Sequence, residues 1–281
     1  MESRAARYSS ASTVFIDARK PWIPLDFREL LRYRELLLIF VWRDIKVRYK
    51  QTALGIAWAV LQPLFLMLVF TLFVGRAAKF QTPGVPYALF VLCGLLPWQL
   101  FNHAVSESTN SLVLNERLIT KVYFPRVIIP LASVMSGLVD FGFSFVLLGG
   151  MMLYYHVRPS GAAWMLPVFL LLALVSAVAI GIWLSALCVE YRDVRFTIPF
   201  LLQFGLLATP IAYPASMIHG RWQVLYGLNP MAGVVEGFRW ALLNQPRPGG
   251  LLLVSTSVVA VILVSGLFYF RRMEDTFADV I

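Results

Sequence analysis

Six long apolar segments constrain the fold of this chain more than any other feature of its sequence. They cover about residues 54–74, 87–106, 127–155, 164–189, 196–215 and 251–270. Each is near or above the roughly 20 residues with which a helix crosses a bilayer core of about 30 Å. Because 59% of the residues are hydrophobic and only 14% are charged, the composition suits lipid rather than water as solvent. The sequence predicts an all-α polytopic membrane protein with six transmembrane helices.

The third and fifth segments depart from a simple spanning helix. Residues 127–155 are more than a straight span needs, which predicts tilt or an extension beyond the membrane. Pro199 and Pro210 interrupt the fifth segment, and a proline removes a helical hydrogen bond and clashes with the preceding turn. We therefore expect kinks or a broken helix within residues 196–215.

The positive charges fall unevenly on the two sides of these spans. If the N-terminus is inside, the segments outside the spans hold 18 of the 24 Lys and Arg residues on the cytoplasmic side and 6 on the external side. Cytoplasmic loops carry such an excess, so both termini are expected in the cytoplasm. The first twenty residues contain no apolar run long enough for a signal peptide, which agrees with this orientation. The net charge of +9 then follows from membrane topology, and no nucleic-acid partner is predicted.

The region before the first span, residues 1–53, is expected to be cytoplasmic, and residues 54–281 to form one transmembrane domain. Asp26 followed by Glu29 is a capping-box pattern at the start of a helix. The residues after it alternate between apolar and basic at helical spacing, which predicts an amphipathic helix at the inner membrane surface. A simple basic stop before the first span would explain the charge but not the period. The apolar positions are Leu30, Tyr33, Leu37, Phe40 and Val41, and the arginines expected to face lipid phosphates or a partner are Arg28, Arg32 and Arg43.

The external stretch between the fifth and sixth spans is long and apolar but too broken to cross a membrane. Asn229 followed by Pro230 is a favourable start for a helix, since Asn caps the first turn and Pro fits its first position. We expect a short re-entrant or interfacial helix at the outer face, with Asn229, Pro230 and Phe238 as candidate residues of an outer gate. The alternative is that this helix only caps the bundle. Its apolar face would comprise Met231, Val234, Val235, Phe238 and Leu242.

The motifs of enzymes that hydrolyse nucleotides or peptides are missing from the sequence. No lysine follows a glycine, so there is no GxxxxGK phosphate loop, and the three histidines lack metal-ligand spacing. The chain is therefore predicted to be neither an ATPase nor a metalloprotein. Asp140 is the one clear charge within a predicted span. Such a residue is a functional candidate, although a structural role between helices is the alternative.

Several motifs, in order along the chain, resemble one family of membrane proteins. They are LGIAWAVLQPL at 54–64, NERLITKVYFPR at 115–126, EYRDV at 190–194, LNP at 228–230 and the tail FRRMEDTFADVI at 270–281. Together they resemble ABC-2-type transporter permeases that export polysaccharides such as O-antigen, teichoic-acid polymers or capsule, and the likeness covers about residues 25–281. The resemblance implies a homodimer in the bacterial inner membrane, bound to two copies of a separate ATPase subunit that holds ATP and Mg. It also implies a lipid-linked polysaccharide substrate.

The resemblance further implies roles for two sets of residues. The link between spans two and three would hold a coupling helix that contacts the ATPase, braced by the next inner loop; an ordinary basic loop is the alternative. Spans one and five would line the path of the sugar chain, although aromatic residues in membrane helices also commonly face lipid. The coupling candidates are Asn115, Glu116, Arg117, Leu118, Ile119 and Lys121, with Tyr191, Arg192 and Asp193 in the next loop. The channel candidates are Trp58, Phe65, Phe196, Phe200 and Phe204.

Two other classes of membrane protein compete with an exporter permease. A secondary transporter is expected to show inverted repeats and more ionisable residues within its spans, and neither is evident. A membrane-embedded transferase needs His, Asp or Glu side chains gathered at one face, and the sequence offers no such pattern. The permease is therefore the favoured reading.

Overall fold

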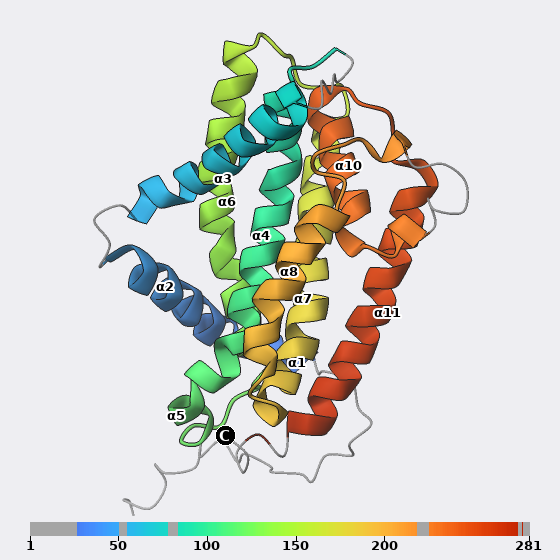
Figure 1. Ribbon diagram of the computed structural model, residues 1–281. Helices are drawn as coiled ribbons and strands as arrows, with labels where there is room; N and C mark the ends of the chain where they lie inside the picture. Colours follow the sequence, from blue (N-terminus) through green and yellow to red (C-terminus); the bar gives the residue numbers. More distant parts are fainter. Residues whose placement is uncertain (1–26, 51–54, 78–83, 218–224, 275–276, 278–281) are drawn as a thin grey trace, which may run out of the picture.

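All regular structure in the described residues is helical. The computed structural model describes residues 27–50, 55–77, 84–217, 225–274 and 277 (Figure 1). The helices are α1 Phe27–Arg32, α2 Arg34–Lys50, α3 Gly55–Phe70, α4 Tyr87–Leu114, α5 Glu116–Ile119, α6 Ile128–Tyr154, α7 Leu166–Glu190, α8 Val194–Ala208, α10 Pro230–Leu243 and α11 Gly249–Glu274. Three short turns extend or join them: the π-helical η1 Thr71–Ala77, and the 3₁₀ segments η2 Ala163–Met165 and η3 Ala215–Met217.

Helix α4 forms the centre of the bundle. It packs against α3, α6, α7, α8 and α10, and 78% of its spanning window is buried. Side chains on all sides of its first half, from Leu89 to Trp98, are enclosed. A helix that is apolar on all sides is stable where other elements surround it, and the first half of α4 has such a sequence and such surroundings.

Five helices of the described chain are long and apolar enough to cross a membrane. They are Ala57–Arg76, Tyr87–Leu114, Ile128–Tyr154, Ala163–Glu190 and Gly249–Glu274. These five coincide with the predicted first, second, third, fourth and sixth spans, and α4 continues to Leu114 rather than ending at residue 106. The all-helical membrane fold is thereby confirmed.

The predicted fifth span is a shorter helix. Helix α8 covers 15 residues, Val194–Ala208, which at about 1.5 Å per residue is shorter than a bilayer core. It ends before Pro210, because a proline disfavours helical geometry in the residue that precedes it. The broken helix expected from the two prolines is therefore observed, with Pro199 inside α8 and Pro210 beyond its end.

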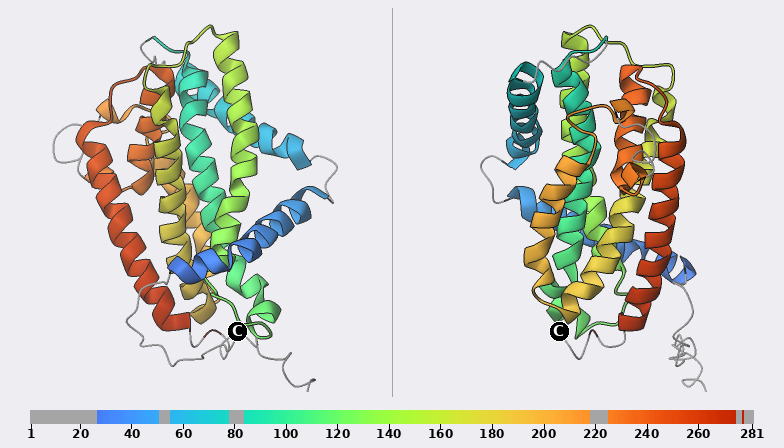
Figure 2. Two further views of the ribbon diagram at one scale, coloured as in Figure 1. Left: turned by 180° about the vertical axis from the view of Figure 1, so that it is seen from behind. Right: turned by 45° about the vertical axis from the view of Figure 1, so that its right-hand side comes forward.

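Helices α3 and α8 leave much of their surface uncovered. Only 11% of the α3 window is buried, and α3 crosses the front of the bundle obliquely in Figure 1. Helix α8 lies in front of α4 in the same view, and both helices lie behind the bundle when it is seen from the back (Figure 2, left). The two helices thus share one flank of the molecule. We call the end of the bundle that holds α5 the α5 end, and the opposite end the α10 end.

A helix is present where the amphipathic helix was predicted, divided into α1 and α2 at Tyr33. However, α2 is not amphipathic as a whole, because Leu38, Ile39 and Trp42 are apolar and exposed. Helix α2 crosses α6 near the α5 end (Figure 2, left). The predicted apolar face is confirmed: Phe40 is buried in a second apolar cluster, and the other four residues of that face pack against it. Asp26 of the predicted capping box and the side chain of Arg28 lie outside the described residues, and Arg32 is exposed.

Candidate functional site

The predicted coupling link presents charged side chains to the surface and apolar ones to the bundle. Glu116, Arg117 and Lys121 are exposed, whereas Ile119 is buried in the second apolar cluster, and Leu118 packs against it. Only four residues, Glu116–Ile119, form the helix α5. The link therefore has a charged outer face on an apolar anchor, and its contact with a partner subunit stays a prediction.

Helix α2 braces this link by two contacts. Arg43 donates a hydrogen bond from Nη1 to the side-chain oxygen of Asn115 at 2.8 Å. The ring of Phe40 meets that of Phe124 edge to face, with centroids 5.8 Å apart. Arg43 was predicted to face lipid or a partner, but part of its guanidinium is directed at the link, and another part pairs with Asp44 at 2.8 Å. The link and α2 are thus in direct contact through one polar and one aromatic pair.

The link is also tied to the end of α11. The main-chain N–H of Arg126 donates to the carboxylate of Glu274 at 3.2 Å, and the Arg126 guanidinium lies 5.9 Å from the ring of Phe277. Phe277 is fully buried against Phe270. The C-terminal end of the last span is therefore anchored to the same link that α2 braces.

The loop between α7 and α8 lies at the same end and is exposed. Tyr191, Arg192 and Asp193 all face outward. A hydrogen bond with the neighbouring Glu190 raises the pKa of Tyr191, and Tyr269 of α11 also donates to Glu190 at 2.9 Å. The structure thus leaves the three predicted bracing residues accessible.

Asp140 belongs to a polar cluster that joins α2 to α6. Arg48 forms an ion pair with its carboxylate at 2.7 Å, and the hydroxyl of Tyr49 donates to it. His103 of α4 lies 4.0 Å from the same carboxylate. Burial of the phenol and the adjacent carboxylate raise the pKa of Tyr49, so it remains a donor at neutral pH. The sequence could not name these partners, because they come from helices distant along the chain.

The five predicted channel aromatics are all exposed on the flank formed by α3 and α8. Phe65 and Trp58 are on α3, with 54% and 58% of their surface accessible. On α8, Phe200 and Phe204 pack with centroids 5.0 Å apart, and the guanidinium of Arg195 lies 4.6 Å from the ring of Phe196. In one copy of the chain, all five rings are therefore exposed on α3 or α8 and none is enclosed.

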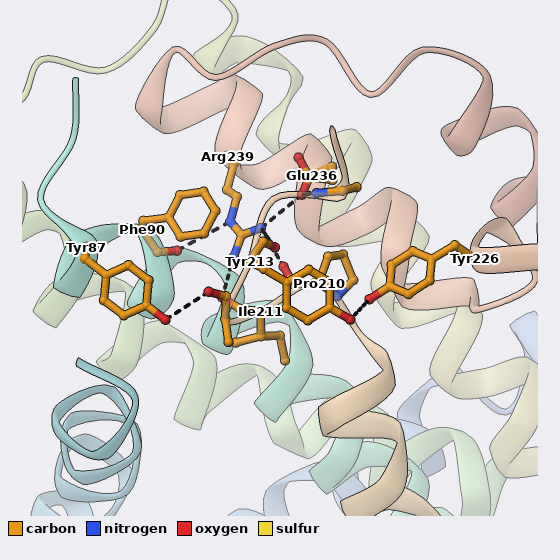
Figure 3. Close-up of polar contacts among 10 residues, drawn as sticks. Tyr87, Phe90, Pro210, Ile211, Tyr213, Tyr226, Glu236 and Arg239 are labelled. Carbon is orange, nitrogen blue, oxygen red and sulfur yellow. Dashed lines mark hydrogen bonds and ion pairs between the residues drawn. The ribbon is translucent and has the colours of Figure 1, made fainter. Parts of the chain in front are cut away.

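A buried arginine organises the α10 end (Figure 3). Arg239 of α10 is fully buried and forms an ion pair with Glu236 one turn earlier, at 3.0 Å. Its guanidinium also donates to the main-chain oxygens of Pro210 at 2.5 Å and Ile211 at 2.6 Å. Further bonds at 3.4 Å reach the carbonyls of Phe90 and Tyr213, and the guanidinium stacks 3.6 Å from the Phe90 ring.

These contacts explain how the chain can leave the helix after α8. Backbone that is not helical exposes carbonyl groups, and such groups are tolerated inside a membrane protein only where protein satisfies them. Arg239 supplies donors to residues 210–213, and Tyr87 donates to the carbonyl of Ala212 at 2.9 Å. The carboxylate of Glu236 accepts the N–H of Ala215 at 3.1 Å. The pair therefore holds the segment after α8 against α4 and α10.

The predicted gate residues lie beside this cluster. Asn229 caps α10 by accepting the N–H of Met231 at 2.9 Å, which confirms the predicted start of the helix, and its amide donates to Thr209 at 2.8 Å. Phe238 is fully buried and meets Phe141 edge to face at 6.1 Å. It therefore packs in the core of this conformation, and its role in a gate stays a prediction.

The Arg239–Glu236 pair was not predicted from the sequence. Arg239 was expected among the external loop charges, but it lies within a buried helix. The sequence held one signal: Glu236 and Arg239 are the only charged residues in the otherwise apolar stretch from Met231 to Leu243. Charges three residues apart in such a helix are expected to pair.

These features define a class of protein: a helical membrane protein with several spans, a broken helix beside its centre and a charged, braced link at one end. Comparison with known proteins identifies the family within that class. The chain belongs to the ABC-2 type transporter family, whose sequence profile matches residues 35–243. The resemblance drawn from the motifs is thereby confirmed.

Individual relatives match over nearly the whole chain. The O-antigen export system permease protein RfbA of Myxococcus xanthus is 32% identical over 252 residues, which are 88% of this chain and 96% of that protein. A protein of the same name from Klebsiella pneumoniae is 26% identical over 248 residues, with 88% and 95% covered. The polysialic acid transport protein KpsM of Escherichia coli is 22% identical over 240 residues, with 83% and 91% covered.

Proposed function

We propose that this chain is the transmembrane permease subunit of an ATP-driven exporter. Its substrate would be a lipid-linked polysaccharide such as O-antigen or a teichoic-acid-type polymer. Two relatives named for O-antigen export share 32% and 26% identity with it, and one named for polysialic acid transport shares 22%. Capsular polysaccharide is therefore the second candidate substrate.

The observation that carries this proposal is the aromatic flank on α3 and α8. A sugar chain cannot cross hydrocarbon unaided, because its hydroxyl groups would lose their hydrogen bonds to water. Aromatic rings can stack on the apolar faces of sugars while a hydrated passage keeps the hydroxyls wet. Because α3 is only 11% buried, a second copy that places its own flank opposite would enclose such a passage. A two-fold homodimer provides this arrangement, since the same surface then contributes from both sides.

The energy would enter through the charged link at the α5 end. The sequence has no phosphate loop, so two copies of a separate subunit are proposed to bind ATP and Mg and to hydrolyse the nucleotide. Closure of that subunit would push on Glu116 and Arg117, and the braces at Asn115 and Arg126 would carry the displacement to α2 and α11. This is a rigid-body switch of the kind that domains make about an interface. The α5 end would then be cytoplasmic, and the membrane would be the bacterial inner membrane.

Deletion of the gene tests the substrate. The proposal expects that one surface glycan is lost, that its lipid-linked precursor accumulates inside the cell, and that the wild-type gene restores export. The purified chain alone is expected to hydrolyse no ATP. An unchanged set of surface glycans after deletion would contradict the proposal.

Charge reversal tests the coupling surface. Glu116→Lys combined with Arg117→Glu should reduce both transport and stimulated ATPase activity, because both side chains are exposed on the face proposed to meet the ATPase. Arg158→Glu is the matched control, since Arg158 is an exposed arginine in the loop between α6 and α7 at the other end of the bundle. If transport and ATPase stimulation both survive the double reversal, the coupling assignment is wrong.

A further inference from the structure

A cavity lined by polar and apolar side chains lies between α3, α4 and α6, beside the exposed aromatic flank, with which it shares Trp58. Its volume is about 500 Å³, which is within the roughly 300–1,000 Å³ of typical ligand sites. Polar side chains from all three helices line it, and Arg48 of α2 closes one side. The residues that carry the argument are Trp58, Gln62, Gln99, Asn102, His103 and Asp140.

Two of these side chains have unsatisfied donor or acceptor groups. The side-chain Nε2 atoms of Gln99 and His103 are buried and find no hydrogen-bond partner among the described residues. Leaving a buried polar atom unpaired is costly, so such atoms point to water or a ligand in the cavity. Three amide side chains around the cavity, from Gln62, Gln99 and Asn102, each both donate and accept. This mixture suits hydroxyl groups, which also donate and accept.

The charges of the cavity disfavour an anion. Arg48 is its one arginine and faces two carboxylates, Asp140 at 2.7 Å and Glu107 at 3.8 Å. Even with a proton on His103, the formal charges of these residues do not sum to a positive value. Sites that bind phosphate or carboxylate groups present arginine forks or helix N-termini in excess of acidic groups. A neutral polyhydroxyl ligand fits better, and Trp58, 58% exposed at the cavity, offers a ring for the apolar face of a sugar.

The cavity continues toward the coupling link. A second cavity, of about 390 Å³, shares Arg48 and Glu107 with it and is lined also by Arg43, Ser111 and Asn115. The polar lining therefore extends from Asn115 at the α5 end to Gln62 on α3. A ligand that enters at the α5 end would meet hydrogen-bonding groups along this route instead of bare hydrocarbon.

We propose that the cavity between α3, α4 and α6 binds a neutral saccharide unit, held by Gln62, Gln99, Asn102 and His103 and stacked on Trp58. This inference rests on the proposed function, because it names the substrate class that the exporter recognises: a glycan that presents a neutral rather than an acidic or phosphorylated sugar to the permease. The site adjoins the aromatic flank through Trp58, and the other four rings of that flank would contact the sugar chain during its passage.

Photolabelling of the full-length chain in lipid nanodiscs tests this site. The probe is octyl glucoside that carries a diazirine in its alkyl chain, and a diazirine octyl phosphate is the matched anionic probe. We expect the glucoside to label peptides of α3, α4 or α6 that line the cavity, and to do so better than the phosphate. Free maltose as competitor distinguishes the two sources of sugar: competition indicates that the saccharide alone is recognised, whereas competition only by unlabelled octyl glucoside indicates a sugar attached to a lipid.

The variant Gln99→Leu combined with Asn102→Leu removes two hydrogen-bonding side chains with little change of volume. Loss of two such bonds should weaken apparent affinity for the glucoside about tenfold or more. Thr256→Val is the control, because Thr256 is exposed on α11 and its hydroxyl bonds only to its own helix at 2.7 Å. Leucine is well tolerated in a membrane helix, and an unchanged size-exclusion profile verifies the fold of each variant.

Three results would overturn the proposal: no labelling of cavity peptides, equal labelling of the double variant, or stronger labelling by the phosphate probe. The deletion experiment separates this inference from the proposed function. If deletion abolishes a surface glycan but the cavity is not labelled, the site is wrong and the exporter function stands. If deletion leaves every surface glycan intact, the proposed function fails, and with it the assignment of the cavity to an exported glycan, whatever the probe labels.

Discussion

Replacement of Arg239 by methionine tests whether this buried arginine holds the segment after α8 in place. Methionine keeps much of the aliphatic volume of the side chain but donates no hydrogen bond. In the native structure the guanidinium is fully buried and donates to the carbonyls of Pro210 and Ile211 at 2.5 and 2.6 Å, and to Glu236 at 3.0 Å. All three acceptors would lose this donor.

The magnitude follows from these losses. Removal of one partner from a buried ion pair destabilises a protein by about 3–5 kcal/mol, because the remaining charge stays buried and uncompensated. The two short bonds to carbonyls add to that loss, although the Glu236 carboxylate can reduce it by taking up a proton. We therefore expect Arg239→Met to lower the free energy of unfolding by about 4 kcal/mol or more. Arg239→Met with Glu236→Gln should be at least about 1 kcal/mol more stable than the single variant, since it removes the unpaired charge.

Unfolding in mixed micelles, titrated with sodium dodecyl sulfate and followed by tryptophan fluorescence, measures these differences. Arg247→Met is the matched control, because Arg247 is exposed and its contact among the described residues is a cation–π contact with Trp240 at 5.7 Å. It should change the free energy of unfolding by less than about 1 kcal/mol. A value for Arg239→Met within about 1 kcal/mol of the native protein would refute the reasoning, since buried donors could not then be what holds residues 210–213.

Two further changes test the packing of α10 by the same titration. Gly237→Ala places a methyl group 2.3 Å from the ring of Phe169 on α7 and should lower the free energy of unfolding by about 1–3 kcal/mol. The control is Gly142→Ala on α6, where nothing lies within 4 Å of the new methyl group, and it should be neutral or slightly stabilising. Equal effects of the two variants would contradict the close approach of α10 and α7. Ser255→Ala removes a buried hydroxyl that bonds to the main chain of residues 227, 229 and 233, and it should lower the free energy of unfolding by about 1–2 kcal/mol. The control, Ser257→Ala, changes an exposed residue and should lower it by less than about 0.5 kcal/mol. A larger loss of stability for Ser257→Ala would show that the bonds of Ser255 do not matter.

Sequence reasoning predicted the parts of the fold that depend on local composition. Five spans were predicted because each is a run of apolar residues long enough to cross the membrane; four match their observed bounds closely, and the second ends at Leu114 instead of residue 106. The start of α10 followed from Asn229 and Pro230, whose capping geometry is a property of a few adjacent residues. The residues by which α2 packs on the bundle could likewise be predicted, since helical spacing alone places Leu37, Phe40 and Val41 on one face.

The partners of buried polar groups were beyond such reasoning. Asp140 was recognised as unusual, but Arg48 is 92 residues away along the chain, and only the crossing of α2 over α6 brings them together. Arg239 was misplaced because hydropathy averages over a window and cannot tell an enclosed charge from one in a loop. The end of α8 likewise depends on a distant residue. Its prolines predicted a break in the helix, but the carbonyl groups that the break leaves free accept hydrogen bonds from Arg239 on another helix.

The two ends of the bundle differ in how strongly they are held, and this difference bears on how force can move through the molecule. At the α10 end, one buried guanidinium joins α4, α10 and the chain that leaves α8, so these parts are expected to move as one body. At the α5 end, buried apolar residues such as Ile119 and Phe124 anchor the link, whereas its polar contacts, such as Arg43 with Asn115, are partly exposed and cost little to rearrange. Under the proposed coupling, a partner that pushes on α5 would shift α2 while the α10 end stays intact. Accordingly, changes at Asn115 should impair transport in a protein that remains folded, whereas changes at Arg239 should first reduce its stability.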